Sequence, residues 1–443
     1  MKTHRTILMV LIIFLSLTGT NYSAVRAQSA YVAPALPIIP DKTFNVRDYG
    51  AVGDSVKDNT NSVQAAINAA VTSGGGMVVI PSGVYLCGPI QFGNNLNLRI
   101  QAGAVLRMLP INKYPGGTID GMNFISGTNL HDIVLSGKGM IDGQGSPWWP
   151  FAKTKGVKRP RMIAFRDCDR VLIEGLKMIN SPMFHITVGG KSTNVTLRDV
   201  IIRAPSSTDP VNPSHNTDAC DVTATKVLIQ RCDVSVGDDD FTCGGGTSDV
   251  LITDCTYGNG HGVSIGSPTR GGVKNITVEN CTFTNTECGI RIKSDRDRGG
   301  VLENLTYRNL KMTNVGMPIL IYATYMAKER QYRDLQKITP EIAETFPTAP
   351  VTPLTPVYRN ISFYNITATA EKGHRAGLVM GLPEAAVSNI LFQNVNIVAD
   401  NPFGIFFADD VKLLNCKIVT KEGTNKLAIT HAKVSIDGKK VNE

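Results

Sequence analysis

The chain has 443 residues, of which 42% are hydrophobic and 19% are charged, so most of it is expected to fold. Residues 1–27 carry three of the eight excess positive charges and no acid, which leaves +5 on the remainder. The basic residues are scattered, without aromatic interleaving, and this argues against a nucleic-acid partner. No stretch after residue 27 is apolar enough to cross a bilayer.

The first segment of the chain has the pattern of a signal peptide. Lys2 and Arg5 precede an apolar run at residues 7–17, and Val25-Arg26-Ala27 provides small residues around a cleavage point. We therefore expect residues 1–27 to be removed and the protein to be secreted or periplasmic. Residues 28–443 would then be the mature chain.

A helix is predicted at residues 62–71, where apolar residues recur at helical spacing. Residues 58–61 offer N-cap candidates, and the glycines at 74–76 mark the end of the helix. Further along, Trp148 and Trp149 are adjacent. They could stack on a sugar, although packing at a bend accounts for them equally well.

An internal repeat organises the rest of the sequence. Its template is Asn or Asp followed by alternating apolar residues, typically repeated after 21 to 38 residues. The first apolar positions of the successive copies are Ile133, Val171, Val195, Val227, Val250, Ile276, Leu305, Ile361, Ile390 and Val411. Period 2 indicates half-buried strands, and strands repeated without intervening helices predict an all-β fold, a single-stranded right-handed parallel β-helix. The helix at 62–71 is expected to cap its first coil.

Other features fit the same architecture. Cys232, Cys255, Cys281 and Cys416 fall at one repeat position, which favours buried, stacked thiols over disulfides. The recurrent Asn residues suit bends, so matches to Asn-x-Ser/Thr are interpreted as by-products of the repeat. Residues 327–357, rich in charge and Pro, interrupt the repeat and predict a loop excursion beside the solenoid.

Polar residues that could take part in catalysis are concentrated in residues 216–293. They form four short motifs, Asn216-Thr217-Asp218, Gly237-Asp238-Asp239-Asp240, Gly260-His261-Gly262 and Arg291-Ile292-Lys293. The motifs are about one coil apart, so a solenoid would bring them side by side on one face. Asp238 and Asp239 reach one cleft only if the backbone bends at Gly237; an extended backbone would pair Asp238 with Asp240 instead.

Each motif alone has an ordinary structural explanation, such as a solvated acidic turn or a solvated basic face. Together at coil spacing they suit the cleavage of a glycosidic bond, which needs one carboxyl to protonate the leaving oxygen and another to activate water or attack directly. Arg291 and Lys293 could hold a substrate carboxylate. His261 could orient the acid or contact the sugar.

These motifs, in this order, resemble those of glycoside hydrolase family 28, the polygalacturonases and their relatives. Residues 44–51, the glycines at 74–76 and Gly143-Gln144-Gly145 are also similar to that group. Two positions differ from the usual family pattern: Ala219 stands where Gly is usual and Asp240 where Cys is usual. Asp240 could alter the pH optimum or the subsite preference.

The resemblance implies an inverting hydrolase of galacturonosyl linkages in pectin that uses no metal or organic cofactor. Asp238 would be the general acid, while Asp218 and Asp239 would activate water. The further assignments are His261 as support for the acid, and Asn216, Arg291, Lys293 and Tyr325 as substrate contacts. We expect a monomer, and the insertion at 327–357 favours exo attack.

Three other functions remain open at this point. Rhamnogalacturonan and xylogalacturonan hydrolases share the motifs. A β-helical pectate lyase would use Asp238–Asp240 to hold calcium. A non-catalytic solenoid would bind pectic glycans without releasing new reducing ends.

Overall fold

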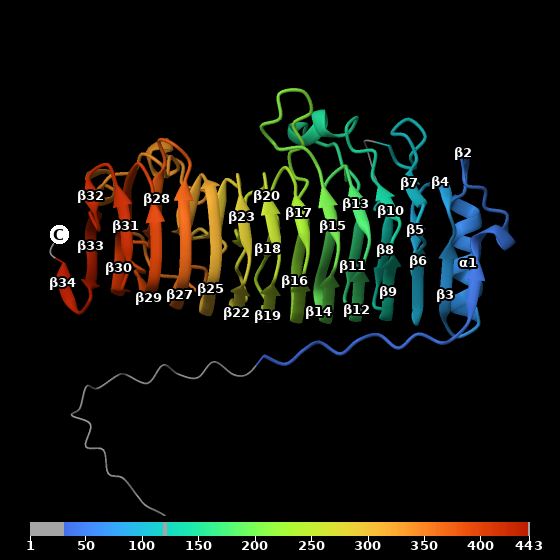
Figure 1. Ribbon diagram of the computed structural model, residues 1–443, viewed down its shortest axis with the longest axis horizontal. Coiled ribbons are helices and arrows are strands. Elements are labelled where there is room, and N and C mark those ends of the chain that lie inside the picture. Colours follow the sequence, from blue (N-terminus) through green and yellow to red (C-terminus); the bar gives the residue numbers. More distant parts are fainter. Residues whose placement is uncertain (1–30, 118–121, 442–443) are drawn as a thin grey trace, which may run out of the picture. The chain divides into compact units, whose positions relative to one another are not determined.

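The computed structural model describes residues 31–117 and 122–441, and the chain from Tyr31 onward forms one compact unit. The region predicted to be a signal peptide, residues 1–27, lies outside the described residues. Within this unit the strands wind into a right-handed parallel β-helix, in which each coil pairs in parallel with the next (Figure 1). Among the described helices, none has the length and apolarity to span a membrane.

Each coil contributes strands to three faces, which we call A, B and C. Face A contains β5 (Ile90–Gln91), β8 (Ile125–Thr128), β11 (Ile163–Arg166), β18 (Phe241–Cys243), β21 (Val263–Ile265), β24 (Cys288–Lys293), β26 (Met317–Tyr322) and β28 (Arg375–Met380). Face B contains β1 (Thr43–Asn45), β3 (Gly76–Ile80), β6 (Leu96–Ile100), β9 (His131–Gly137), β12 (Asp169–Glu174), β19 (Thr247–Thr253) and β22 (Val273–Glu279). Face C contains β2 (Asp54–Asp58), β4 (Gly83–Cys87), β7 (Ala104–Met108), β10 (Met140–Asp142), β13 (Lys177–Ile179), β15 (Ile201–Arg203), β17 (Asp233–Ser235), β20 (Thr256–Gly258), β23 (Thr282–Thr284) and β31 (Lys417–Thr420).

Longer strands bend around a corner and belong to two faces. These are β14 (Ile186–Arg198), β16 (Cys220–Gln230), β25 (Val301–Val315), β27 (Val357–Ala370), β29 (Val387–Val398), β30 (Asn401–Leu414) and β33 (Leu427–Ile436). Two short strands, β32 (Gly423–Thr424) and β34 (Lys439–Val441), pair antiparallel with β31 and β33 near the C-terminal end. Short 3-10 helices are η1 (Val46–Tyr49), η2 (Trp149–Lys153) and η3 (Arg330–Tyr332).

The predicted apolar anchors form one continuous stack through face B. Ile133 pairs with Val171, Val171 with Val195, and the register continues coil by coil to Val411. Every member is at most 3% exposed. Burying a side chain of this size stabilises the fold by about 1.5–3 kcal/mol. The sequence repeat therefore marked the register of the solenoid.

Asparagines at the corners adopt the left-handed conformation and bond to each other between coils. Asn309 has φ +56°, donates to Asn280 and accepts from Asn365. A second column runs through Asn275, Asn304 and Asn360. Asn tolerates positive φ better than most residues, so the same residue type both turns the corner and ties neighbouring coils together.

The N-terminal end of the solenoid is covered by a helix, as expected. Helix α1 (Thr60–Thr72) packs Val63, Ala66, Ile67 and Ala70 onto the first coil. Its N-cap residue is Asn59, within the predicted 58–61 range, but the Asn59 side chain accepts from Val52 N at 2.7 Å instead of from the helix.

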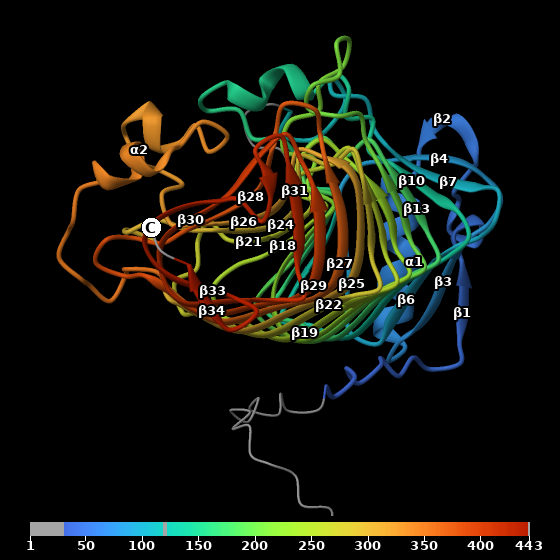
Figure 2. The ribbon, with the colours of Figure 1, turned by 60° about the vertical axis from the view of Figure 1, so that its left-hand side comes forward.

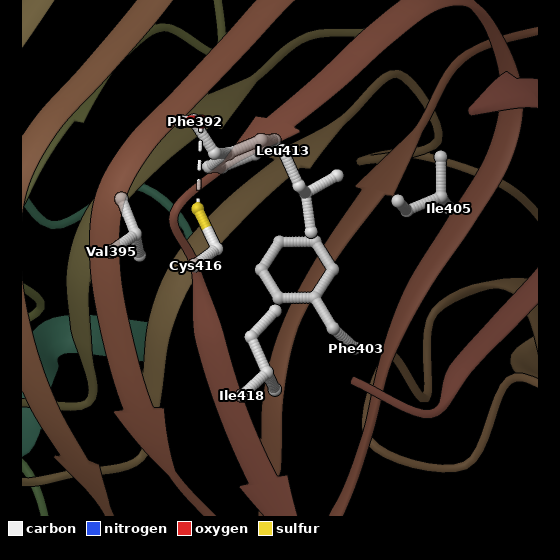
Figure 3. Close-up of a pocket in the computed structure, with 7 residues that line it drawn as sticks. All are labelled: Phe392, Val395, Phe403, Ile405, Leu413, Cys416 and Ile418. Atoms are coloured by element: carbon white, nitrogen blue, oxygen red, sulfur yellow. Dashed lines mark hydrogen bonds between the residues drawn. The ribbon is translucent and has the colours of Figure 1, made fainter. Parts of the chain in front are cut away.

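The core confirms several smaller expectations. All nine cysteines are buried free thiols. Trp148 and Trp149 are buried by packing. The core contains an apolar void of only about 10 Å³ near the C-terminal end (Figure 3). Its lining residues are Phe392, Val395, Phe403, Ile405, Leu413, Cys416 and Ile418.

The 327–357 insertion leaves the solenoid as predicted. It contains η3 and the short helix α2 (Pro340–Glu344), which packs against β30 and β33 (Figure 2). Arg296 anchors the insertion by donating to both oxygens of the buried Glu384 carboxylate and to Pro347 O.

Candidate active site

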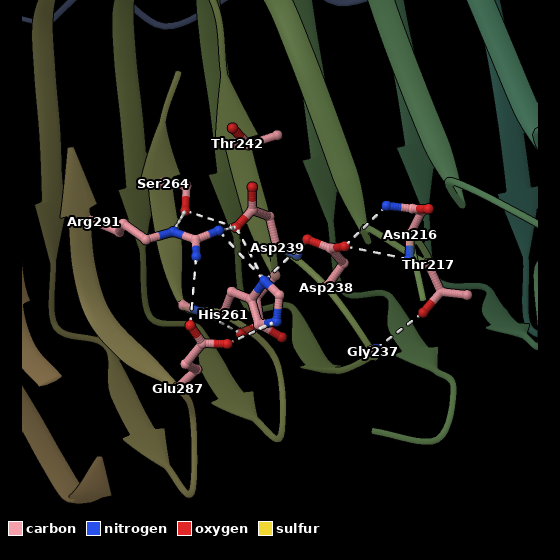
Figure 4. A network of polar contacts seen from close by, with 12 residues as sticks. Asn216, Thr217, Gly237, Asp238, Asp239, Thr242, His261, Ser264, Glu287 and Arg291 are labelled. Carbon is pink, nitrogen blue, oxygen red and sulfur yellow. Dashed lines mark hydrogen bonds and ion pairs between the residues drawn. The ribbon is translucent and has the colours of Figure 1, made fainter. Parts of the chain in front are cut away.

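The four polar motifs meet where successive coils enter face A. Asp218 precedes β16, Asp238 and Asp239 precede β18, and His261 precedes β21. Backbone hydrogen bonds join neighbouring coils at this point, with Ala219 N donating to Asp239 O at 2.9 Å and His261 N to Asp238 O at 2.8 Å. The coil spacing of the sequence motifs therefore corresponds to direct contact in space (Figure 4).

A bend at Gly237 turns both Asp238 and Asp239 toward the site, as one of the two sequence interpretations required. Gly237 N donates to the Thr217 hydroxyl at 2.9 Å, which ties the first motif to the second. A Cβ at Gly237 would lie 2.3 Å from Ser214 O, so no larger residue fits. The alternative pairing of Asp238 with Asp240 is wrong.

Asp240 is 1% exposed and bonds to the turn of the next coil. Its Oδ2 accepts from Gly262 N at 2.9 Å, and burial raises the pKa of Asp240 well above its usual value. A Cβ at Gly260 would lie 2.2 Å from Asp240 Oδ1. Asp240 therefore braces the turn that carries His261, and its raised pKa favours the neutral carboxyl beside the other acids.

Asp239 is the most strongly held carboxylate of the site. It accepts from Arg291, from Lys293 Nζ at 2.8 Å and from Ser264 Oγ at 2.8 Å. Burial opposes ionisation, but the charges of Arg291 and Lys293 outweigh it and hold the pKa of Asp239 well below its usual value. Arg291 and Lys293 point the same way, as their spacing predicted, but in this structure the carboxylate they bind is that of Asp239.

Asp238 is the more accessible acid, with 19% of its side chain exposed against 4% for Asp239. Asn216 donates to Asp238 Oδ2 through its backbone and side-chain nitrogens, at 3.3 and 3.2 Å. His261 Nδ1 lies 3.0 Å from Asp238 Oδ1. Burial alone would raise the pKa of Asp238, but the hydrogen bond and charge of His261 outweigh burial and lower it.

His261 is held between two carboxylates. Its Nε2 lies 3.0 Å from Glu287 Oε2, on the side opposite Asp238. Burial disfavours a charged imidazole, yet the hydrogen bonds to Asp238 and Glu287 raise the pKa of His261 to about 10. His261 is therefore a cation at neutral pH and stabilises Asp238 in its ionised form.

Asp218 carries the opposite protonation preference. Its Oδ1 is buried without a hydrogen-bond partner. Burial, with the neighbouring charges of Asp221, Asp238 and Asp239, raises the pKa of Asp218 well above its usual value. Among the three predicted catalytic carboxyls, the pKa is raised for Asp218 and lowered for Asp238 and Asp239, and acid–base chemistry requires such a division.

Tyr325, which was expected to contact the substrate, is 36% exposed, and Lys293 Nζ is 5.5 Å from the centroid of its ring. Sequence reasoning missed Arg159, which is buried and donates to Asn216 Oδ1 at 2.7 Å. It also missed Glu287, although its position four residues before Arg291 could have suggested a contact with that arginine.

Two cavities lie next to the site on the side of the earlier coils, where Asn216 and His215 contribute to their walls. One of about 370 Å³ is lined partly by Arg159, Arg161 and Asn216. The other, of about 270 Å³, lies between the η2 loop and residues 211–215. Acids with raised and lowered pKa values, the cations Arg291 and Lys293, and the two cavities therefore lie in one region of the molecule.

The fold and the site together define the class of this protein: it is a right-handed parallel β-helix in which carboxylates from successive coils meet at one corner. The particular family follows from sequence comparison. A family model described as "Glycosyl hydrolases family 28" matches residues 76–344, and the chain belongs to that family. A second model, "Rhamnogalacturonase A/epimerase, pectate lyase-like", matches residues 43–102.

Individual proteins are similar over much of the chain. A "Probable polygalacturonase" of Arabidopsis thaliana is 34% identical over 289 residues, covering 64% of this chain and 61% of that protein. An "Exopolygalacturonase" of Zea mays is 33% identical over 302 residues, covering 65% and 71%. Among solved structures, a hyperthermoactive exopolygalacturonase from Thermotoga maritima has a TM-score of 0.71 at 24% identity, covering 92% of this chain and 95% of that one.

Proposed function

We propose that the protein hydrolyses galacturonosyl linkages in pectin. One observation carries the proposal: three successive coils deliver Asp218, Asp238, Asp239 and His261 to one corner, beside the buried cations Arg291 and Lys293. Family membership and the similarity to polygalacturonases support it. A sugar that carries a carboxylate suits this cationic surrounding, because Arg291 and Lys293 keep donors beyond those given to Asp239.

In the proposed reaction Asp238 protonates the leaving oxygen. In the free protein the raised pKa of Asp218 keeps the proton there, while His261 keeps Asp238 ionised. A substrate carboxylate arriving near His261, Arg291 and Lys293 offsets their positive charge and so raises the pKa of Asp238. Transfer of the proton to Asp238 leaves Asp218 ionised and able, with Asp239, to activate a water for inversion.

The remaining assignments follow the same proposal. Asn216 positions Asp238 and contacts the sugar, and Tyr325 contacts the sugar beside Lys293. The 327–357 insertion supports exo attack, and the pattern of residues 1–27 supports export to the periplasm or the medium. We propose a monomer with a pectic oligosaccharide or polysaccharide as its partner.

A calcium-dependent lyase fits this site less well. Asp238, Asp239 and His261 lie close enough for a shared ion, but two buried cations already neutralise Asp239. A divalent cation would have to be placed beside three positive side chains. The hydrolase proposal needs no such rearrangement.

The test is cleavage of polygalacturonate by the wild type and by Asp238→Asn. The wild type should release reducing ends without the ultraviolet absorbance of an unsaturated product, and proton NMR should show the inverted anomer first. Asp238→Asn should abolish turnover and leave the circular dichroism spectrum unchanged. Turnover within tenfold of wild type would remove Asp238 from the acid role, and an unsaturated product would replace hydrolysis with elimination.

A further inference from the structure

A second group of basic side chains lies on the opposite side of the acids from Arg291 and Lys293. Lys158, Arg159 and Arg161 line the cavity of about 370 Å³ together with Asn216. Asn216 is also the residue that donates to Asp238. Asn216 therefore connects the wall of the cavity to the proposed acid, and a sugar inside the cavity would adjoin the bond being cleaved.

Coil register places Arg161 relative to the acids. Met162 N donates to Phe184 O, and His185 N donates to Asp218 O, so Arg161, Phe184 and Asp218 share one register position on consecutive coils. Arg161 thus precedes Asp218 by two coils, or about 10 Å. Arg291 lies two coils after Thr242, on the side of the later coils. The acids are therefore flanked by cations along the axis.

The three basic residues have different tasks. Arg159 is buried, and its guanidinium donates hydrogen bonds to Pro182 O, His215 O and Asn216 Oδ1. Arg161 is only partly buried, with its guanidinium 5.3 Å from the centroid of the Phe184 ring. Within residues 31–117 and 122–441 no carboxylate forms an ion pair with Arg161, so Arg161 is the better candidate for binding a ligand.

The acid that interacts with Arg161 does not neutralise it in acidic solution. Asp221 interacts with Arg161, but burial raises the pKa of Asp221 to about 8 and its Oδ1 has no hydrogen-bond partner. A neutral Asp221 leaves the positive charge of Arg161 available. The cavity consequently favours an anionic group over a neutral sugar.

We propose that Arg161 binds the carboxylate of the sugar on the earlier-coil side of the cleaved bond, while Arg291 and Lys293 bind that of the sugar on the other side. This deepens the proposed function and rests on it. Both sugars that flank the bond then carry a carboxylate. Arg161 is then a specificity-determining residue, because a chain that places neutral rhamnose beside it loses this contact and is a poor substrate.

The first experiment compares kcat/KM on trigalacturonate for wild type, Arg161→Gln, Arg161→Lys and the control Arg166→Gln. Arg166 ends β11, the strand that begins two residues after Arg161, and 70% of its side chain is exposed. Losing a charge-assisted hydrogen bond should lower kcat/KM of Arg161→Gln about 10- to 100-fold, mainly through KM. Arg161→Lys should recover part of the loss, and Arg166→Gln should stay within about twofold of wild type.

The second experiment measures trigalacturonate binding by calorimetry in the Asp238→Asn background, with and without Arg161→Gln. Binding should weaken about tenfold or more when Arg161 is replaced. If this occurs but the wild type cleaves no galacturonan, the carboxylate site stands and the hydrolase proposal fails. If the wild type cleaves galacturonan and Arg161→Gln changes neither kcat/KM nor binding, the present proposal is overturned. Equal kcat/KM on trigalacturonate and on an alternating galacturonate–rhamnose oligomer would also overturn it.

Discussion

Replacing Arg291 by Met removes one of the two cations that neutralise the buried carboxylate of Asp239. The side chains of Arg291 and Asp239 are only 8% and 4% exposed. Leaving one partner of such a buried pair alone typically costs about 3–5 kcal/mol. Because Lys293 Nζ remains 2.8 Å from the second oxygen of Asp239, we expect the lower end, about 3 kcal/mol. Adding Asp239→Asn removes the stranded charge and should recover about 1–2 kcal/mol of that loss.

Urea unfolding followed by tryptophan fluorescence measures these differences, because both tryptophans, Trp148 and Trp149, are buried. The matched control is Arg308→Met, which removes an ion pair with Glu279 from an arginine side chain that is 51% exposed. That pair should contribute less than about 1 kcal/mol. The control separates the loss of a buried charge partner from the general effect of replacing arginine by methionine.

Two results would refute this reasoning. One is a loss for Arg291→Met no larger than for Arg308→Met, and the other is a double variant with no recovery. The pH dependence gives a further check. Since the folded protein holds the pKa of Asp239 below its usual value, the stabilisation is present above about pH 4 and is lost as the pH falls further. The advantage of wild type over Asp239→Asn should therefore shrink in that acidic range.

The other predictions concern the turn at His261 and the asparagine columns. Glu287→Gln removes the negative charge that helps to raise the pKa of His261, so the alkaline limb of the kcat/KM profile should move to lower pH; an unmoved limb contradicts this. Gly260→Ala should destabilise the protein by about 1–3 kcal/mol through its clash with Asp240, and Asp240→Ala should relieve it in thermal unfolding; additive losses would exclude that contact. Asn309→Ala combines two lost hydrogen bonds with an unfavourable positive φ, whereas Asn309→Gly loses the hydrogen bonds alone. The alanine variant should therefore melt at a lower temperature, which corresponds to a free energy of unfolding about 1–2 kcal/mol smaller at the midpoint. Equal melting temperatures would exclude backbone strain.

The solenoid and its register could be predicted because they depend on a local rule repeated many times. Alternation marks the inward residues, and the repeat interval marks the next coil, so Val195 and Val227 align without knowledge of distant contacts. The chemical motifs follow from the same rule. Their mutual contact needs only that each sits one coil after the last.

What the sequence could not decide depends on directions at bends. Whether Asp239 or Asp240 joins Asp238 is set by the backbone at Gly237 and by a turn in the next coil that takes up Asp240. The ion pairs of Arg291 and Lys293 with Asp239 likewise depend on how far these side chains extend across two coils. Arg159 belongs to no repeat or motif, so nothing in its surroundings in the sequence indicated its contact with Asn216.

The asparagine columns also bear on production of the protein in eukaryotic cells. Asn194, Asn275, Asn304 and Asn360 each begin an Asn-x-Ser/Thr acceptor sequence. In each, the side-chain nitrogen that a glycan would modify already donates to an oxygen of the preceding coil. Attachment of a glycan would remove a hydrogen from that nitrogen and place a bulky sugar between coils 4.8 Å apart, about the spacing of any paired strands. Folded protein passing through a secretory pathway should therefore remain unmodified at these four positions, and their occupancy would report chains that had not yet wound into coils.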